Sequence, residues 1–153
     1  IDYLTIHLWP ENWNWYRSDH SDSLPIIQIQ NYIQQHLNLA HRLQKPIVLE
    51  EFGLARDKRD FSDSSSTNLR DVFYQLLIET MLTAQKDFPE WSGLNFWAWS
   101  GAGRPALDGC YWQLGDAFTG DPPHEPQGWY SVYDTDSSTL QIIDNLSQKL
   151  KKQ

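Results

Sequence analysis

Three segments of the chain have the apolar patterns of β-strands. From Tyr3 to Trp9, apolar residues alternate with polar or aromatic ones, the period of a strand with two different faces. Pro10 ends this strand, because proline cannot donate to a sheet ladder. Residues 47–49 are a short apolar run between a proline and a glycine, typical of a strand in a parallel sheet that is buried on both faces. Residues 94–99 repeat the alternation and predict a third strand.

Between and after these strands, apolar residues recur every three or four positions. This spacing predicts amphipathic helices over about 26–44, 68–86 and 138–150. Ser66 or Thr67 is the expected N-cap of the second helix. Residues 131–133 are predicted to form a short extended piece.

The predicted order is therefore β-α-β-α-β-α, with strands that begin near residues 3, 47 and 94. Such repeated units predict an α/β fold with parallel strands and right-handed crossovers. In folds of this class, the chemistry lies at the carboxyl ends of the strands. The connection over 100–127 is long enough to predict a functional loop, and we expect it to form part of a site wall.

Composition narrows the possible partners. The 153 residues carry a formal net charge of −8, and the basic side chains are scattered, which disfavours nucleic acid and anionic membrane as partners. No apolar run approaches the length of about 18 residues that a membrane-spanning helix needs. The eight Trp, seven Tyr and six Phe exceed what a core of this size requires, and aromatic faces suit a sugar ligand.

Two adjacent glutamates follow the second strand. By strand parity, Glu51 shares a face with Ile47 and Leu49, whereas Glu50 lies on the opposite face, so only one of the two points into a site. We expect that one to be Glu51, beside His7, Trp9 and Trp97 from the flanking strands, and expect Glu50 to bond to a neighbouring strand or helix. A carboxylate at a strand end over an aromatic floor suits nucleophilic or general-base chemistry on a pyranose.

These motifs resemble glycoside hydrolase family 5, a clan A family of (β/α)8 barrels. The resemblance is carried by His7-Leu8-Trp9, by Glu51-Phe52-Gly53 after a hydrophobic strand, and by Asn95-Phe96-Trp97. The stretches 1–7, 45–53 and 120–134 are most similar to the endo-β-1,4-mannanases of that family. The likeness spans nearly the whole chain.

The resemblance implies specific roles. Glu51 matches the nucleophile on strand 7, His7 and Trp9 match the pair on strand 6 that shapes the site, and Trp97 matches the strand-8 platform under the sugar. The family commonly has Tyr where Trp9 stands, and an indole cannot give the nucleophile a phenolic hydrogen bond. Trp99 and Trp13 are further candidate substrate contacts, with packing as the alternative. No cofactor is implied, and no metal either, because His20, His36, His41 and His124 lack metal-ligand spacing.

Two features of a complete enzyme are absent from the sequence. A retaining glycosidase needs a second carboxylate about 5 to 5.5 Å from the nucleophile, and the Asn-Glu pair that supplies it in the family does not occur at a strand end here. A barrel of eight units also takes about 250 residues. We therefore expect residues 1–153 to be the C-terminal part of one catalytic barrel, strands 6 to 8, inactive without the remainder on the same or a separate chain.

The expected substrate is β-mannan, hydrolysed internally with retention. Two alternatives stay open: a β-1,4-glucanase of the same family, since specificity rests on loops, and a module that binds polysaccharide without chemistry. Because insoluble polymers are met outside cells, the resemblance also implies a secreted protein.

Overall fold

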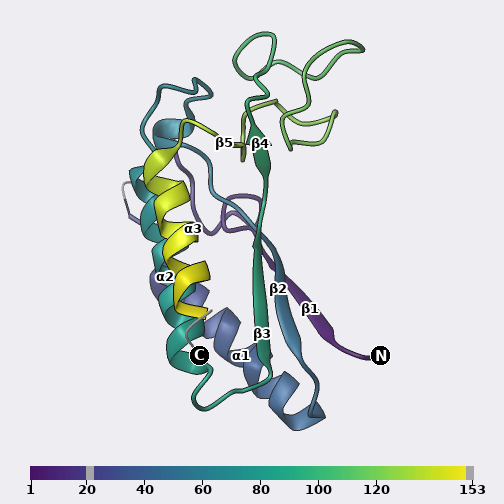
Figure 1. Ribbon diagram of the computed structural model, residues 1–153, viewed down its shortest axis with the longest axis vertical. Coiled ribbons are helices and arrows are strands. Elements are labelled where there is room, and N and C mark those ends of the chain that lie inside the picture. The colour runs from purple at the N-terminus through teal and green to yellow at the C-terminus, as the bar shows by residue number, and fades with distance from the viewer. Residues whose placement is uncertain (20–22, 151–153) are drawn as a thin grey trace.

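The computed structural model describes residues 1–19 and 23–150. Its centre is a parallel sheet in the order β1-β2-β3 (Figure 1). The strands are β1 (Leu4–Leu8), β2 (Ile47–Phe52) and β3 (Trp91–Phe96), and the helices are α1 (Ile26–Leu43), α2 (Asn68–Ala84) and α3 (Ser137–Leu150). The chain is thus α/β with parallel strands, as the apolar patterns predict.

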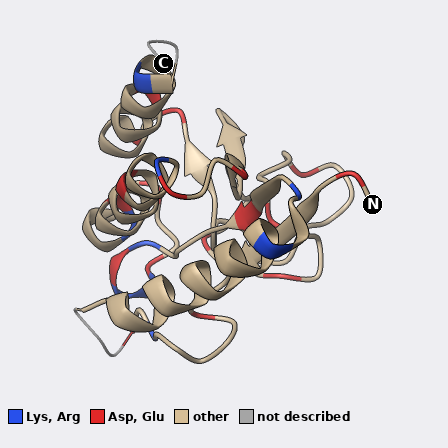
Figure 2. Ribbon diagram, turned by 90° about the horizontal axis from the view of Figure 1, so that it is seen from below, with Lys and Arg blue, Asp and Glu red and all other residues tan. Residues whose placement is uncertain are grey.

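The helices lie on one side of the strands and follow one another in an arc around them (Figures 1 and 2). The core forms between the sheet and the buried stripe of α1, which is Ile29, Ile33, Leu37 and Ala40. Phe52 of β2 meets the ring of Tyr74 on α2 edge to face at 5.0 Å. Burial of these stripes is what orients the helices and fixes which face of each strand is covered.

A β-bulge in β2 changes which residues share a face. Ile6 of β1 pairs with Leu49, but the next residue, His7, pairs with Glu51, so Glu50 is an extra residue in β2. The register with β3 shifts at the same place. Leu49 pairs with Leu94 and Phe52 pairs with Phe96, so β2 has one more residue than β3 between these two pairs. Leu49 and Phe52 can therefore both pack in the core. The parity prediction, which placed Glu51 with Leu49 on one face, is wrong for this reason.

The third predicted strand is displaced toward the N-terminus. β3 ends at Phe96, three residues before the predicted end, and a cis peptide bond joins Trp97 to Ala98. The chain then forms β4 (Trp99–Gly101), which pairs in parallel with β5 (Val132–Tyr133). The second pair of strands ties the end of the 100–127 connection back to its start.

The N-terminus of α2 is capped from a distance. Thr67 occupies the N-cap position, but its hydroxyl donates to Asp71 rather than accepting from a backbone amide. The carboxylate of Asp57, in the short helix η1 (Asp57–Arg59), instead accepts from the amides of Asn68 and Leu69 at 3.0 Å each. The predicted position of the cap is confirmed, but the predicted capping side chain is wrong.

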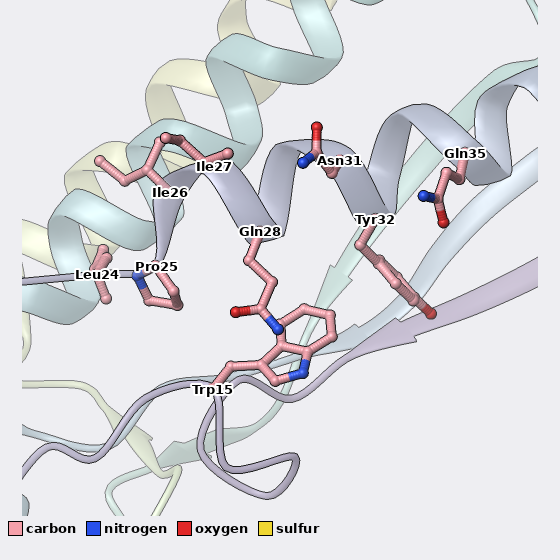
Figure 3. Close-up of a pocket in the computed structure, with 9 residues that line it drawn as sticks. All are labelled: Trp15, Leu24, Pro25, Ile26, Ile27, Gln28, Asn31, Tyr32 and Gln35. Carbon is pink, nitrogen blue, oxygen red and sulfur yellow. The ribbon is translucent and has the colours of Figure 1, made fainter.

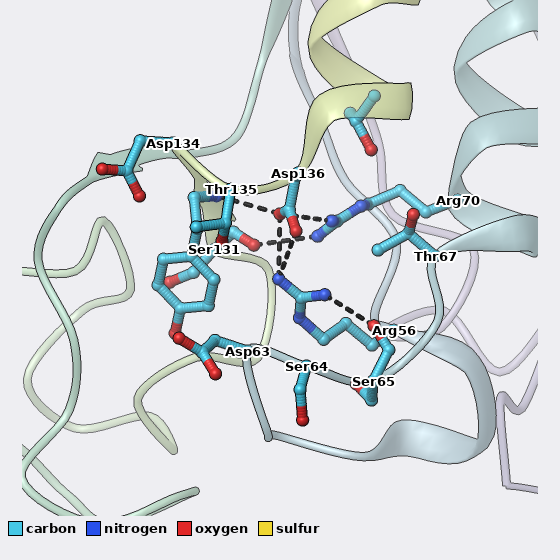
Figure 4. A network of polar contacts seen from close by, with 12 residues as sticks. Arg56, Asp63, Ser64, Ser65, Thr67, Arg70, Ser131, Asp134, Thr135 and Asp136 are labelled. Atoms are coloured by element: carbon cyan, nitrogen blue, oxygen red, sulfur yellow. Dashed lines mark hydrogen bonds and ion pairs between the residues drawn. The ribbon is translucent and has the colours of Figure 1, made fainter.

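A buried ion cluster joins the loop after β2 to α2 and to the start of α3 (Figure 4). Asp136 accepts from Arg56 at 2.6 and 2.9 Å and from Arg70 at 2.6 Å. Arg56 and Arg70 are fully buried, and Arg70 also donates to the carbonyl of Ser131. One carboxylate thus holds two guanidinium groups at the level of the carboxyl ends of the strands.

The sheet has two edges, β1 and β3, without a further strand in the described part of the chain. In that same part, no helix covers the face of the sheet opposite the helices (Figure 1). None of the described helices is long and apolar enough to cross a membrane.

Candidate active site

Three ionisable side chains meet at the carboxyl end of the sheet. Nδ1 of His7 lies 3.3 Å from Oε2 of Glu51, and Nε2 of the same ring lies 3.5 Å from Oε2 of Glu50. The side chains of His7 and Glu50 are each 42% exposed and that of Glu51 is 31% exposed. Both glutamates therefore reach the site, where parity allowed only one, because the bulge turns the strand between them.

Trp9 and Trp97 lie against Phe52 and Gly53, the two residues that follow Glu51. Their ring centroids are 6.3 Å apart in an edge-to-face arrangement. Trp97 is held by its amide, which donates to the carbonyl of Phe52 at 2.8 Å, one residue after Glu51. Gly53 lies under the indole of Trp9, which is why the residue after Phe52 has no side chain. The sequence thus brings His7, Trp9, Glu51 and Trp97 to one end of the sheet.

An aromatic wall continues from Trp9 through residues that the sequence did not single out. The rings of Trp9 and Tyr130 are 4.8 Å apart, and Trp129 stacks on Tyr130 at 5.1 Å. The guanidinium of Arg59 lies 4.3 Å from the centre of the Trp129 ring. This wall joins the loop after β2 to the loop before β5.

Polar contacts fix the wall to the loop that follows β1. The hydroxyl of Tyr130 donates to Asn12, and Nε1 of Trp129 donates to Glu11 at 3.3 Å. Burial, reinforced by the negative charge of Glu11, raises the pKa of the Tyr130 phenol far above its ordinary value, so the hydroxyl stays protonated and can donate. Glu11 is itself buried and accepts from Ser18 at 2.6 Å.

The end of the 100–127 connection is fastened by a buried carboxylate. Asp121 accepts from the amides of Gly128 and Tyr130 and from the hydroxyl of Ser131. Burial raises the pKa of the Asp121 carboxyl, and these donors oppose that rise. Both carboxylate oxygens of Asp121 accept hydrogen bonds from within the protein, so its role here is structural.

The two remaining tryptophans predicted to contact substrate lie in different surroundings. Trp13 packs against Trp15 at 4.9 Å and against Tyr32 of α1 at 5.2 Å, in the loop after β1. Trp99 is 55% exposed on β4. Among the described residues, neither forms a ring pair with His7 or Trp97 or a hydrogen bond with Glu51. Their roles as substrate contacts stay predictions.

The described residues contain no group of three or more histidine, cysteine, aspartate and glutamate side chains that could hold a metal ion. His36 and His41 make contacts within the fold, to the carbonyl of Tyr32 and to Glu90. His20 lies outside the described residues.

The sequence singled out the strand-end residues but missed Glu50, Tyr130 and Trp129 as neighbours of the site. The period-two rule hides Glu50, since only the paired register of both neighbours reveals the bulge. Tyr130 and Trp129 come near Trp9 from 120 residues along the chain, and no local pattern announces such a contact. The signal available was their position within the stretch 120–134 that resembles the mannanases.

Comparison with known proteins shows which family this chain resembles. Residues 1–153 match the family described as GH family 5 beta-mannosidase-like. A family 5 mannosidase from Rhizomucor miehei is 38% identical, with a TM-score of 0.88 over 99% of this chain and 38% of that chain. A variant of it in complex with mannosyl-fructose is 36% identical, with a TM-score of 0.82 over 99% of this chain and 38% of that chain.

Curated relatives agree with these solved structures. Mannan endo-1,4-beta-mannosidase 5 of Arabidopsis thaliana is 26% identical over 99% of this chain and 32% of its own length. The chain thus spans about a third of the length of such relatives. The resemblance stated from the motifs is confirmed, and the chain belongs to glycoside hydrolase family 5.

Proposed function

We propose that this chain is the C-terminal part, strands 6 to 8, of a (β/α)8 barrel that hydrolyses internal β-1,4 bonds of mannan with retention. The observation that carries the proposal is the carboxylate of Glu51 at the end of β2, 3.3 Å from Nδ1 of His7 and next to the Trp9 and Trp97 rings. The names of the relatives, a mannan endo-1,4-beta-mannosidase and a family 5 mannosidase, support a β-mannoside substrate.

Glu51 is the nucleophile in this proposal. Its carboxylate attacks the anomeric carbon, and a covalent glycosyl-enzyme forms as the glycosidic bond breaks. His7, with Nδ1 at 3.3 Å from the carboxylate, holds its orientation. Trp97 offers an apolar face to the sugar ring, and Trp9, which contacts Trp97 edge to face, supports that surface.

The acid that protonates the leaving oxygen is not supplied by this chain. Glu50 contacts the same imidazole as Glu51 and belongs to the same strand, so it does not face the nucleophile across a bound sugar. The carboxylate of Glu11 is occupied by Ser18 and Trp129. The resemblance to family 5, in which an Asn-Glu pair on strand 4 supplies this group, implies that the acid/base residue belongs to the preceding part of the barrel.

The partner of this chain is that preceding part, on the same or a separate polypeptide. Three strands cannot close a barrel, and the open edges of β1 and β3 offer backbone groups for further strands. A hollow of about 880 Å³ also lies along α1, lined by apolar and amide side chains such as Ile27, Gln28 and Tyr32 (Figure 3). Leu39 and Leu43 of α1 are exposed as well. A helix of the preceding unit would cover this flank.

The test uses the complete protein that contains these residues, with Glu51→Gln as the informative variant. We expect release of reducing ends from β-mannan to fall by at least about 1,000-fold, because the amide is a poor nucleophile. Glu79→Gln, on the exposed face of α2, makes the same charge change away from the site and should keep the wild-type rate. A Glu51→Gln enzyme with normal activity would refute the assignment of the nucleophile.

Two comparisons separate the alternatives. Faster hydrolysis of mannan than of cellulose supports the mannanase reading, and the reverse order supports a glucanase. Binding of either polymer without hydrolysis by the complete protein would identify a binding module.

The isolated chain of residues 1–153 is expected to release no reducing ends, since it lacks the acid/base residue. Secretion is part of the proposal because the substrate is an extracellular polymer, and assay of the culture fluid of the source cells tests it.

A further inference from the structure

We infer that Glu50 is a positioning residue: it holds the imidazole of His7 so that Nδ1 faces the carboxylate of Glu51. The inference rests on the proposed role of Glu51 and adds a second carboxylate that acts through His7 rather than on the substrate.

The β-bulge provides the geometry. In a regular strand, adjacent side chains point to opposite faces, and Glu50 would turn away from His7 when Glu51 faces it. Here Glu50 is the extra residue between the pairs Ile6–Leu49 and His7–Glu51, and its carboxylate reaches Nε2 of His7 at 3.5 Å. Bulges commonly redirect a side chain next to an active site.

The chemistry of Glu50, His7 and Glu51 determines how the imidazole is oriented between the two carboxylates. An ionised carboxylate only accepts hydrogen bonds, so the two contacts are favourable together when the ring is an imidazolium with a proton on both Nδ1 and Nε2. Nδ1 meets Glu51 and Nε2 meets Glu50, which leaves the ring little freedom to rotate. Glu50 therefore fixes the direction in which His7 donates to the nucleophile.

A role for Glu50 in fold stability is less consistent with its surroundings. Its side chain is 42% exposed, and His7 is its ion-pair partner among the described residues. By contrast, the carboxylates that do fasten the fold, Asp121 and Asp136, are buried and each accept several hydrogen bonds. Loss of Glu50 should thus change the site and leave the stability of the fold unchanged.

The experiment compares Glu50→Ala and Glu50→Gln in the complete protein. Alanine removes both charge and acceptor, and we expect kcat on β-mannan to fall about 10-fold or more, with KM unchanged, because the carboxylate contact that orients His7 is lost. Glutamine keeps an oxygen that can accept from Nε2 and should restore part of that loss. Both variants should melt within about 2 °C of the wild-type protein. Unchanged kcat in Glu50→Ala, or a parallel loss of kcat and melting temperature in both variants, overturns the inference.

Crystal structures of the wild-type protein and Glu50→Ala give a readout that does not depend on hydrolysis. We expect the separation of Nδ1 of His7 from Glu51, 3.3 Å here, to exceed hydrogen-bonding distance in the variant. An unmoved ring contradicts the positioning role. If the wild-type protein does not cleave mannan, the proposed function fails, while this comparison still decides what Glu50 does.

Discussion

Gly53 lies directly beneath the indole of Trp9: a Cβ on Gly53 would stand 2.8 Å from Cζ3 of that ring. The same Cβ would lie 2.8 Å from the carbonyl oxygen of Trp97. One small residue thus lets the indole of Trp9 and the backbone of Trp97 close over the end of β2, next to the carboxylate of Glu51. The requirement for glycine here is one of space.

Gly53→Ala should therefore displace Trp9 or Trp97. We expect a loss of about 1–3 kcal/mol in the free energy of unfolding, as for other overpacked sites, and a rise in KM for mannan in the complete protein. Gly93→Ala on β3 is the matched control, because its Cβ would meet Val48 at an ordinary 3.7 Å. Denaturant unfolding and initial-rate kinetics measure the two effects. Equal behaviour of the two variants would show that the Trp9 ring moves aside without cost.

The sequence was sufficient to predict the order of strands and helices and the strand-end residues His7, Trp9, Glu51 and Trp97. Apolar periodicity carries this information because burial of one face dictates the pattern. Periodicity could not locate the bulge at Glu50, because a bulge is defined by how β2 pairs with its neighbour and leaves no mark in the sequence of β2 itself. Contacts between distant loops, such as Asn12 with Tyr130, leave no local signal either.

The cap of α2 shows the same limit and is open to test. Asp57→Ala removes the carboxylate that accepts from the amides of Asn68 and Leu69 and from the hydroxyl of Ser66. We expect a loss of about 1–2 kcal/mol in stability, the usual effect of deleting an N-cap side chain. Asp60→Ala, whose carboxylate accepts from the amide of Ser62 in an exposed turn, should lose less than about 0.5 kcal/mol. Thermal unfolding followed by circular dichroism distinguishes them, and equal losses would refute the distant cap.

Asp121 predicts a pH dependence of stability. Burial raises the pKa of its carboxyl in the folded protein above its ordinary value, so the folded state binds the proton more tightly than the unfolded chain does. The stability contributed by this group is therefore gained as pH falls through the folded-state pKa, is complete below the unfolded value, and is lost as pH rises.

Asp121→Asn removes this titration and places an amide against the donors of Gly128 and Tyr130. The variant should be less stable at neutral pH by about 1–3 kcal/mol, and the gap should widen toward pH 4. Melting temperatures of the two proteins between pH 7 and pH 4 check this. A gap that narrows on acidification would contradict the sign of the effect.

The ion cluster around Asp136 makes the strongest stability prediction. Asp136→Asn leaves the guanidinium groups of Arg56 and Arg70 buried without a counter-charge, since their exposed fractions are 1% and 0%. Removing one partner from a buried ion pair costs about 3–5 kcal/mol, and we expect that loss here. Asp134→Asn removes a carboxylate that pairs with Arg104 at an exposed position and should cost at most about 1 kcal/mol.

Because Asp136 links the loop after β2 to α2 and to the start of α3, its loss should also loosen the loop that follows Glu51. Hydrogen exchange of the amides between residues 53 and 66 measures this, and unchanged protection there would confine the effect of Asp136 to the helices.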